Sequence, residues 1–246
     1  MCKSALITGG AQGIGKCIAK TLAAQGCRSF IMDIDLEAGE ETALEIEGVS
    51  FLHGDVASEA DVLRCVEAVA RESGGMDILV CNAAIGIRKP VTELTLEEWN
   101  RVVGVDLTGV FLCAKHAAPH LKVRCGSIVN VASTRAFMSE RNGEAYGAAK
   151  GGVVSLTHAL AASLGPEVRV NCVAPGWIEV GPWKKRSARA APQHSDADRM
   201  QHPVGRVGRP EDVAELVAYL SSGKAGFITG MTFTVDGGMT RKMVYV

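Results

Sequence analysis

The sequence has almost no net charge, few aromatic residues and no long apolar run. Its 26 Lys and Arg residues nearly balance 27 Asp and Glu residues. Nucleic-acid binding normally requires a basic face, so this balance argues against a nucleic-acid partner. No segment approaches the roughly 18 apolar residues that span a bilayer, and the N-terminus lacks the charged-then-apolar pattern of a signal peptide. We therefore expect a cytoplasmic protein with no membrane contact.

The sequence also lacks the spacings that metal-ligating and disulfide-forming residues adopt. Its 8 cysteines form no C-x-x-C pair, and its 6 histidines form no H-E-x-x-H pair. Most of the cysteines lie in apolar runs, namely Cys17, Cys65, Cys81, Cys113 and Cys172. Buried thiols of a cytoplasmic protein stay reduced. We therefore predict neither a metal site nor a disulfide framework.

What the sequence does contain is a regular alternation of short Val- and Ile-rich runs with longer amphipathic segments. Strands buried on both faces have this composition. The runs predict seven strands, Ala5–Thr8, Ser29–Asp33, Val49–His53, Ile78–Asn82, Ser127–Ser133, Arg169–Ala174 and Thr232–Val235. Repeated strand–helix–strand units require parallel strands and right-handed crossovers. The prediction is an α/β fold of the Rossmann type, with a doubly wound parallel sheet and helices on both faces.

Several helix starts are marked in the sequence, and one segment breaks the alternation. Ser58, the Thr95–Glu98 capping box and Pro210 each begin a predicted helix. No linker divides the chain, so residues 1–246 are expected to form a single domain. Residues 181–203, here named the insert, show no apolar period and carry several basic residues. We expect the insert to be a mobile surface segment.

A glycine-rich turn follows the first predicted strand. It contains Gly9, Gln12, Gly13, Ile14 and Gly15, and a helix is predicted to start near Ile14. Glycine permits a tight turn and the close approach of a pyrophosphate, and the helix directs its free N–H groups at that phosphate. Because the turn lies between a strand and a helix, its position indicates a dinucleotide site.

An acidic residue ends the second predicted strand. The carboxylate of Asp33 can accept hydrogen bonds from the ribose hydroxyls of an adenosine and would repel a 2′-phosphate. The turn itself has Gln12 and no cation. These features favour NAD over NADP as the cofactor. Asp35 is a nearby competitor, but it follows the strand and is expected to be a solvated loop acid.

A phenol and an ammonium lie four residues apart at Tyr146 and Lys150, which places them on one face of a helix. A phenol has a pKa of about 10, which is too high for acid/base catalysis at neutral pH. A neighbouring cation stabilises the phenolate and so lowers that pKa. Ser133 ends a predicted strand and can donate to a substrate oxygen. The three residues predict a proton donor, a cation that lowers the pKa of that donor and a hydroxyl that polarises a carbonyl for hydride transfer. Tyr146 and Lys150 are also predicted to contact the cofactor, with Lys150 holding the nicotinamide ribose.

In combination these motifs resemble the short-chain dehydrogenase/reductase family over nearly the whole chain. The resemblance includes the glycine turn, Asp55-Val56, Asn82-Ala83-Ala84, Ser133, Tyr146-x-x-x-Lys150, Pro175-Gly176 and Val235-Asp236-Gly237-Gly238. It implies that Asp55 and Val56 line the adenine pocket and that Asn82 and Ala83 support the strand beside the cofactor. It further implies that Pro175 and Ile178 flank the nicotinamide. The family is typically tetrameric, so a homo-oligomer, tetramer or dimer, is expected.

Two positions depart from the family pattern. Asp106 stands where the family usually has a catalytic Asn that holds a water linking the lysine to solvent. An Asp keeps the backbone carbonyl but loses the amide donor, and a buried carboxylate there could instead pair with Lys150. Val180 stands where a Thr commonly contacts the carboxamide. Neither change removes the Tyr–Lys pair, so the prediction of an enzyme stands.

The sequence does not determine the substrate. The insert lies where the family has its substrate lid, and its Lys184, Lys185, Arg186 and Arg189 either attract an anionic substrate or form a solvated basic face. The leading prediction is an NAD-dependent dehydrogenase acting on a small alcohol or carbonyl substrate. One alternative is a 3-oxoacyl thioester reductase; because reductive biosynthesis usually uses NADPH, the preference of Asp33 for NAD argues against it. The other alternative is an NAD-binding scaffold that has lost its catalytic activity through Asp106.

Overall fold

The computed structural model describes residues 3–243, and within this range all strands belong to one parallel sheet. The strand order is β3-β2-β1-β4-β5-β6-β7, so the order reverses between β1 and β4. The seven strands of this described part are β1 (Ser4–Thr8), β2 (Arg28–Asp33), β3 (Val49–His53), β4 (Ile78–Cys81), β5 (Ser127–Val131), β6 (Arg169–Pro175) and β7 (Thr232–Val235). The predicted doubly wound sheet is confirmed.

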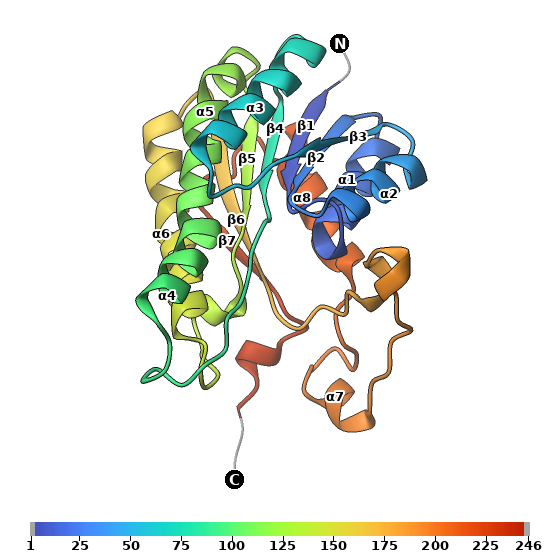
Figure 1. Cartoon of the computed structure of the whole chain (residues 1–246), viewed down its shortest axis with the longest axis vertical. Coiled ribbons are helices and arrows are strands. Elements are labelled where there is room, and N and C mark those ends of the chain that lie inside the picture. Colours follow the sequence, from blue (N-terminus) through green and yellow to red (C-terminus); the bar gives the residue numbers. More distant parts are fainter. Residues whose placement is uncertain (1–2, 244–246) are drawn as a thin grey trace.

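Helices cover both faces of the sheet (Figure 1). One face is packed by α1 (Gly13–Ala24), α2 (Leu36–Glu45) and α8 (Pro210–Leu220). The other is packed by α3 (Glu59–Ser73), α5 (Gly109–Val123) and α6 (Glu144–Leu164). A shorter helix, α4 (Leu96–Val103), leads through a π-helical turn, η1 (Gly104–Thr108), into α5. The predicted helix starts are confirmed, since Ser58 caps α3, Thr95 and Glu98 form a capping box, and Pro210 opens α8.

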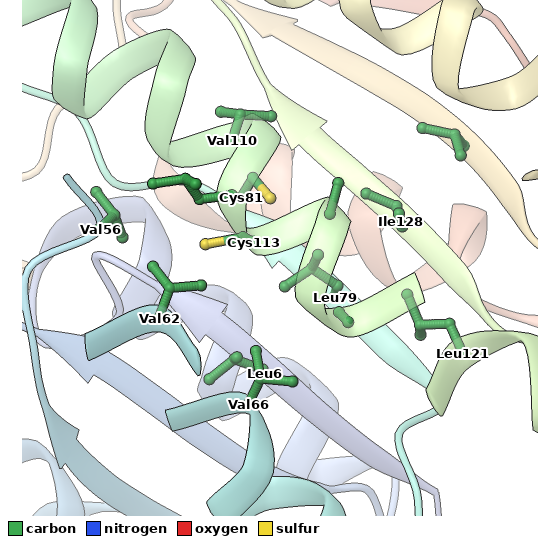
Figure 2. Packing of buried hydrophobic residues seen from close by; sticks show 14 of the residues in the cluster. Leu6, Val56, Val62, Val66, Leu79, Cys81, Val110, Cys113, Leu121 and Ile128 are labelled. Atoms are coloured by element: carbon green, nitrogen blue, oxygen red, sulfur yellow. The ribbon is translucent and has the colours of Figure 1, made fainter. Parts of the chain in front are cut away.

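The core consists of two apolar clusters, one on each side of the sheet. Figure 2 shows part of the cluster beneath α3 and α5, where Leu6 and Leu79 of the sheet meet Val62, Val66 and Val110 of the helices. All five cysteines of the apolar runs are buried and free, as predicted. None of the helices in residues 3–243 is long and apolar enough to cross a membrane. No group of His, Cys, Asp or Glu in that range is arranged to hold a metal ion.

Two predicted strands are too long, and both corrections lie at predicted site residues. β4 ends at Cys81, because the Asn82 backbone N–H donates to the Thr8 hydroxyl (3.0 Å) instead of continuing the ladder. β5 ends at Val131, and Ser133 instead caps a short 3-10 turn, η2 (Thr134–Ala136), by accepting from the Arg135 N–H (3.1 Å). Side-chain hydroxyls thus redirect the backbone at the carboxyl edge of the sheet.

The insert also differs from expectation, because it contains short helical pieces. They are η3 (Gly181–Trp183), η4 (Arg186–Ala188) and α7 (Asp196–Met200). Ser195 and Asp198 form a capping box at the start of α7, which accounts for a helix without an apolar period. The insert lies beyond the carboxyl ends of the strands, below α1 and α2 in Figure 1.

Candidate active site

The glycine turn connects β1 to α1 at the point where the strand order reverses. Gly9 has a positive φ of 61°, and a Cβ there would lie 2.7 Å from the Cα of Ala83. A Cβ on Gly15 would lie 2.1 Å from the Gly9 carbonyl oxygen. Real Cβ atoms do not approach so closely, so both positions require glycine. The glycines let the turn pack directly on the segment that follows β4.

Asn82 ties the glycine turn to β4. Its amide nitrogen donates to the carbonyl oxygens of Thr8 (3.1 Å) and Gly9 (2.9 Å). In return, the Thr8 hydroxyl accepts from the backbone N–H groups of Asn82 and Ala83 (3.0 and 3.1 Å). These bonds fix the shape of the turn without any ligand. The family resemblance implies that Asn82 and Ala83 support the strand beside the cofactor. The four hydrogen bonds join both residues to the end of β1 and the glycine turn.

The first turn of α1 has no side-chain partner among the described residues. Gln12 is the N-cap residue, yet its side chain makes no capping bond, and the first turn contains no acidic residue. The helix N-terminus therefore leaves free N–H groups and the positive end of its dipole at the glycine turn. This is the arrangement that binds a phosphate.

A cavity of about 500 Å³, here named the turn cavity, opens over this helix end. Eight of the predicted cofactor-binding residues line it, namely Gly9, Gln12, Gly13, Asp33, Asp55, Val56, Asn82 and Ala83. Val180 lines it as well. Ile14 and Gly15 lie in α1 behind the turn, and Pro175 ends β6. Ile178 forms an isolated bridge with Gly208 and does not line the cavity. A dinucleotide fits the chemistry of this lining.

Asp33 presents its carboxylate to the turn cavity. One oxygen accepts from the Ala11 N–H and the other from the Asp35 N–H, both at 3.1 Å. A carboxylate has four lone-pair positions, so two remain for a ligand. Asp35 is not a free loop acid, since it caps α2 and pairs with Lys185 at 3.1 Å. The Ala38 N–H, which donates to it, lowers the pKa of Asp35, and Lys185 lowers it further.

Two cations that the sequence analysis did not assign to the cofactor site border the turn cavity. Arg101, from α4, pairs with Asp55 at 2.9 Å. Lys184, from the insert, lines the cavity and forms no ion pair with the described residues. No local pattern marks either residue, because α4 and the insert reach the cavity only through the tertiary fold.

A second, smaller cavity of about 220 Å³ contains both Ser133 and Tyr146, and we name it the Tyr146 cavity. Lys150 lies behind it, with its side chain only 2% exposed. The Lys150 ammonium is 5.5 Å from the centre of the Tyr146 ring and donates to the Val131 carbonyl oxygen at 3.1 Å. The fold thus brings the predicted hydroxyl, phenol and ammonium to one place at the carboxyl end of β5.

Asp106 is fully buried in the π-helical turn η1 and connects Lys150 to the wall of the site. One carboxylate oxygen accepts from the Ile85 N–H at 2.8 Å. The other lies 3.5 Å from the Lys150 ammonium and has no hydrogen-bond partner within the described structure. Burial raises the pKa of the Asp106 carboxyl, and Lys150 offsets only part of this rise. Asp106 therefore forms with Lys150 the ion pair that was considered for an Asp in place of the Asn of the family pattern.

The segment after β4 forms a wall shared by both cavities. Ala83, Ala84 and Ile85 line the turn cavity, and the next three residues, 86–88, line the Tyr146 cavity. The two cavities are therefore adjacent along this segment. Asp106 holds this wall at its midpoint through the Ile85 N–H.

Three basic residues of the insert pair with acidic residues of α2, and none of the basic residues of the insert lines the Tyr146 cavity. Lys185 pairs with Glu37 (2.7 Å), and both Arg186 (3.2 Å) and Arg189 (2.7 Å) pair with Glu45. The buried ammonium of Lys16 also bonds to Glu45. Lys16 is the main cause that lowers the pKa of Glu45 to about 2, followed by Arg189 and Arg186. Anionic substrate attraction by this cluster is therefore not supported; the cluster fastens the insert to α2.

Comparison with known proteins identifies the family. A family model described as enoyl-(acyl carrier protein) reductase matches residues 9–240. An uncharacterized oxidoreductase of Thermotoga maritima is 48% identical, covering 99% of this chain and 98% of that protein. A cis-4-hydroxycyclohexanecarboxylate dehydrogenase of Sinomonas cyclohexanicum is 38% identical, covering 96% of each. A 3-ketoacyl-(acyl-carrier-protein) reductase of Brucella melitensis, solved with NADH, has a TM-score of 0.88 at 37% identity, covering 97% and 98%.

The chain belongs to the short-chain dehydrogenase/reductase family. It is accordingly an oxidoreductase that transfers a hydride between a nicotinamide cofactor and an alcohol or carbonyl group of a small molecule.

Proposed function

We propose that this protein is an NAD-dependent dehydrogenase or ketoreductase in which Tyr146 is the general acid and base. One observation carries the proposal: Ser133 and Tyr146 line a single cavity, with the Lys150 ammonium behind the phenol, and that cavity shares a wall with the turn cavity. Proton donor and hydride carrier would then meet at one substrate carbon and its oxygen.

The proposed mechanism assigns one role to each side chain. When bound in the turn cavity, the nicotinamide cofactor supplies or accepts the hydride. In the reductive direction, the Tyr146 hydroxyl donates its proton to the substrate oxygen, and Ser133 donates a hydrogen bond to the same oxygen. Lys150 stabilises the resulting phenolate through its charge. In the oxidative direction, Tyr146 accepts the proton of the alcohol.

NAD rather than NADP is proposed because Asp33 places a negative charge in the turn cavity. A 2′-phosphate at the adenosine ribose would be repelled by that carboxylate. Lys185 and Arg101 do not offset it, since each is already paired with acidic residues. Among the described residues that line the turn cavity, Lys184 is the cation without an acidic partner, and it is the one proposed to hold a 2′-phosphate if NADP binds.

The function is tested by mixing the purified protein and NAD with a panel of secondary alcohols that includes cis-4-hydroxycyclohexanecarboxylate, and by following NADH absorbance. A 3-oxoacyl thioester with NADH is the second arm. Turnover of alcohols supports the proposal, whereas turnover of the thioester alone favours the reductase alternative, which is the activity named for the Brucella melitensis relative. Tight NAD binding with no turnover in either arm would favour a scaffold.

We further propose a cytoplasmic homo-oligomer formed by one domain of 246 residues. An edge strand, β7, ends the sheet, and Phe227 and Met231 beside it are exposed. Exposed apolar residues next to an unpaired edge suit a contact with a second copy. Light scattering of the protein and of Phe227→Lys tests this: a smaller mass for the variant supports the contact, and a monomeric wild type contradicts it.

A further inference from the structure

The Tyr146 cavity carries an excess of positive charge that the proton-transfer chemistry does not require. Three arginines line it, Arg88 from the shared wall and Arg135 and Arg141 from the segment between β5 and α6. Glu140 is the only acidic side chain of its lining within the described residues. The lining therefore contains three arginines and one acidic residue.

The single carboxylate is divided between two of the arginines. The Arg88 guanidinium lies 2.9 Å from one oxygen of Glu140, and the Arg135 guanidinium contacts the other. Arg141 forms no ion pair with any residue in the range 3–243. Glu140 thus shows that a carboxylate can be held between these guanidinium forks, and one cation remains without a partner.

The cavity also limits the size of its ligand. A volume of about 220 Å³ admits a small molecule, so an anionic group and the reacting oxygen must belong to the same short compound. We propose that the Tyr146 cavity binds a small hydroxy or oxo acid, with its reacting oxygen at Ser133 and Tyr146 and its carboxylate at Arg135 and Arg141. This inference rests on the proposed function and specifies its substrate class.

Glu140 and the arginines are expected to act with opposite signs. Replacing Arg141 or Arg135 removes a charge-assisted hydrogen bond to the substrate carboxylate, which lowers the preference for acids. Replacing Glu140 by Gln releases Arg88 and Arg135 and removes a like charge, which raises that preference. If the ion pairs only supported the loop, replacing Arg135 or Glu140 would weaken turnover of acids and neutral ketones together, and replacing Arg141 would leave the preference unchanged.

The test compares two oxo acids, 4-oxopentanoate and 5-oxohexanoate, with their neutral methyl esters. The measured quantity is the acid-to-ester ratio of kcat/KM at saturating NADH. We expect Arg141→Gln and Arg135→Met to lower the ratio about tenfold each, as for loss of one charged hydrogen bond. The Arg135 backbone N–H that holds Ser133 remains in the variant. Glu140→Gln should raise the ratio, and Arg71→Gln, an exposed position on α3, is the matched control.

A binding experiment separates this inference from the proposed function. Calorimetry on Tyr146→Phe with NADH measures the affinity of acid and ester without turnover. Tighter binding of the acid supports the inference even if no compound is reduced, in which case the proposed function fails alone. Esters that bind or react as well as acids would overturn the inference and leave hydride transfer intact. Tighter binding of hydroxyacetone phosphate than of either acid would overturn it in favour of a phosphate.

Discussion

The two cavities share a wall, but the backbone shapes the turn cavity and side chains shape the Tyr146 cavity. The turn cavity is shaped by backbone: Gly9 and Gly15 leave no room for a Cβ, and Asn82 fixes the turn through carbonyl oxygens. The Tyr146 cavity is shaped by side chains, with Ser133 and Tyr146 at one end and arginines around them. Backbone geometry suits a constant cofactor, whereas long side chains can change from one relative to the next and so set substrate choice.

The largest effect is expected in the Tyr146 cavity. Tyr146→Phe removes the proton donor and should lower kcat by at least about a hundredfold, the low end for loss of a general acid. NAD affinity should change little, because Tyr146 does not line the turn cavity. Steady-state kinetics and NAD titration measure the two quantities. A variant that keeps its turnover would remove Tyr146 from the mechanism.

The next effect belongs to the backbone of the turn cavity. Gly15→Ala would place a Cβ 2.1 Å from the Gly9 carbonyl oxygen and 2.6 Å from the Asn82 amide nitrogen. Overpacking of this kind costs about 2 kcal/mol. Because the added Cβ distorts the turn on which the cofactor is proposed to bind, we expect NAD binding to weaken roughly thirtyfold, the affinity change that corresponds to this free energy. Fluorescence titration with NADH measures the change. Gly223→Ala, where a Cβ has nothing within 4 Å, is the control, and equal NADH affinity in both variants would contradict the prediction.

A smaller effect is expected at Asp33, which lines the turn cavity with a carboxylate. Asp33→Ala removes the charge that repels a 2′-phosphate, and the ratio of NAD to NADP affinity should fall roughly tenfold. Binding of both cofactors is measured by titration. Adding Lys184→Gln to this variant should weaken NADP again if Lys184 then holds the phosphate. An unchanged ratio in Asp33→Ala would refute the role of Asp33.

The smallest effect concerns the shared wall, which Asp106 holds. Its folded-state pKa is raised by burial, so its stabilising contribution is complete below pH 3.8 and is lost as pH rises through the raised value. Asp106→Asn avoids that loss and leaves no unpaired carboxylate oxygen. Relative to wild type, the variant should gain about 1 kcal/mol as pH rises from about 3.8 to neutrality, the scale of one unsatisfied buried acceptor.

Thermal unfolding across this pH range measures the difference. Asp196→Asn, which removes a carboxylate from an exposed position, is the control. A difference between Asp106→Asn and wild type that stays constant with pH would mean that Asp106 does not titrate as its burial requires.

Much of this protein follows from local sequence. Alternation of apolar runs specified a parallel sheet, and three of its helices begin where Ser58, Thr95 and Pro210 predict. These features are readable because capping and strand burial depend on neighbours within a few residues. The glycine turn and the Tyr146–Lys150 spacing are equally local, and they were enough to predict where a nucleotide and a proton donor belong.

Only the tertiary structure decided what surrounds those groups. It paired three cations of the insert with α2 and brought Lys184 and Arg101 to the turn cavity. It placed Arg88, Arg135 and Arg141 in the lining of the cavity that contains Ser133 and Tyr146. It also ended β5 before Ser133 and placed Asp106 against Lys150. Charged side chains act on groups that are distant along the chain, so their partners depend on how helices and loops pack, and no spacing in the sequence records that packing.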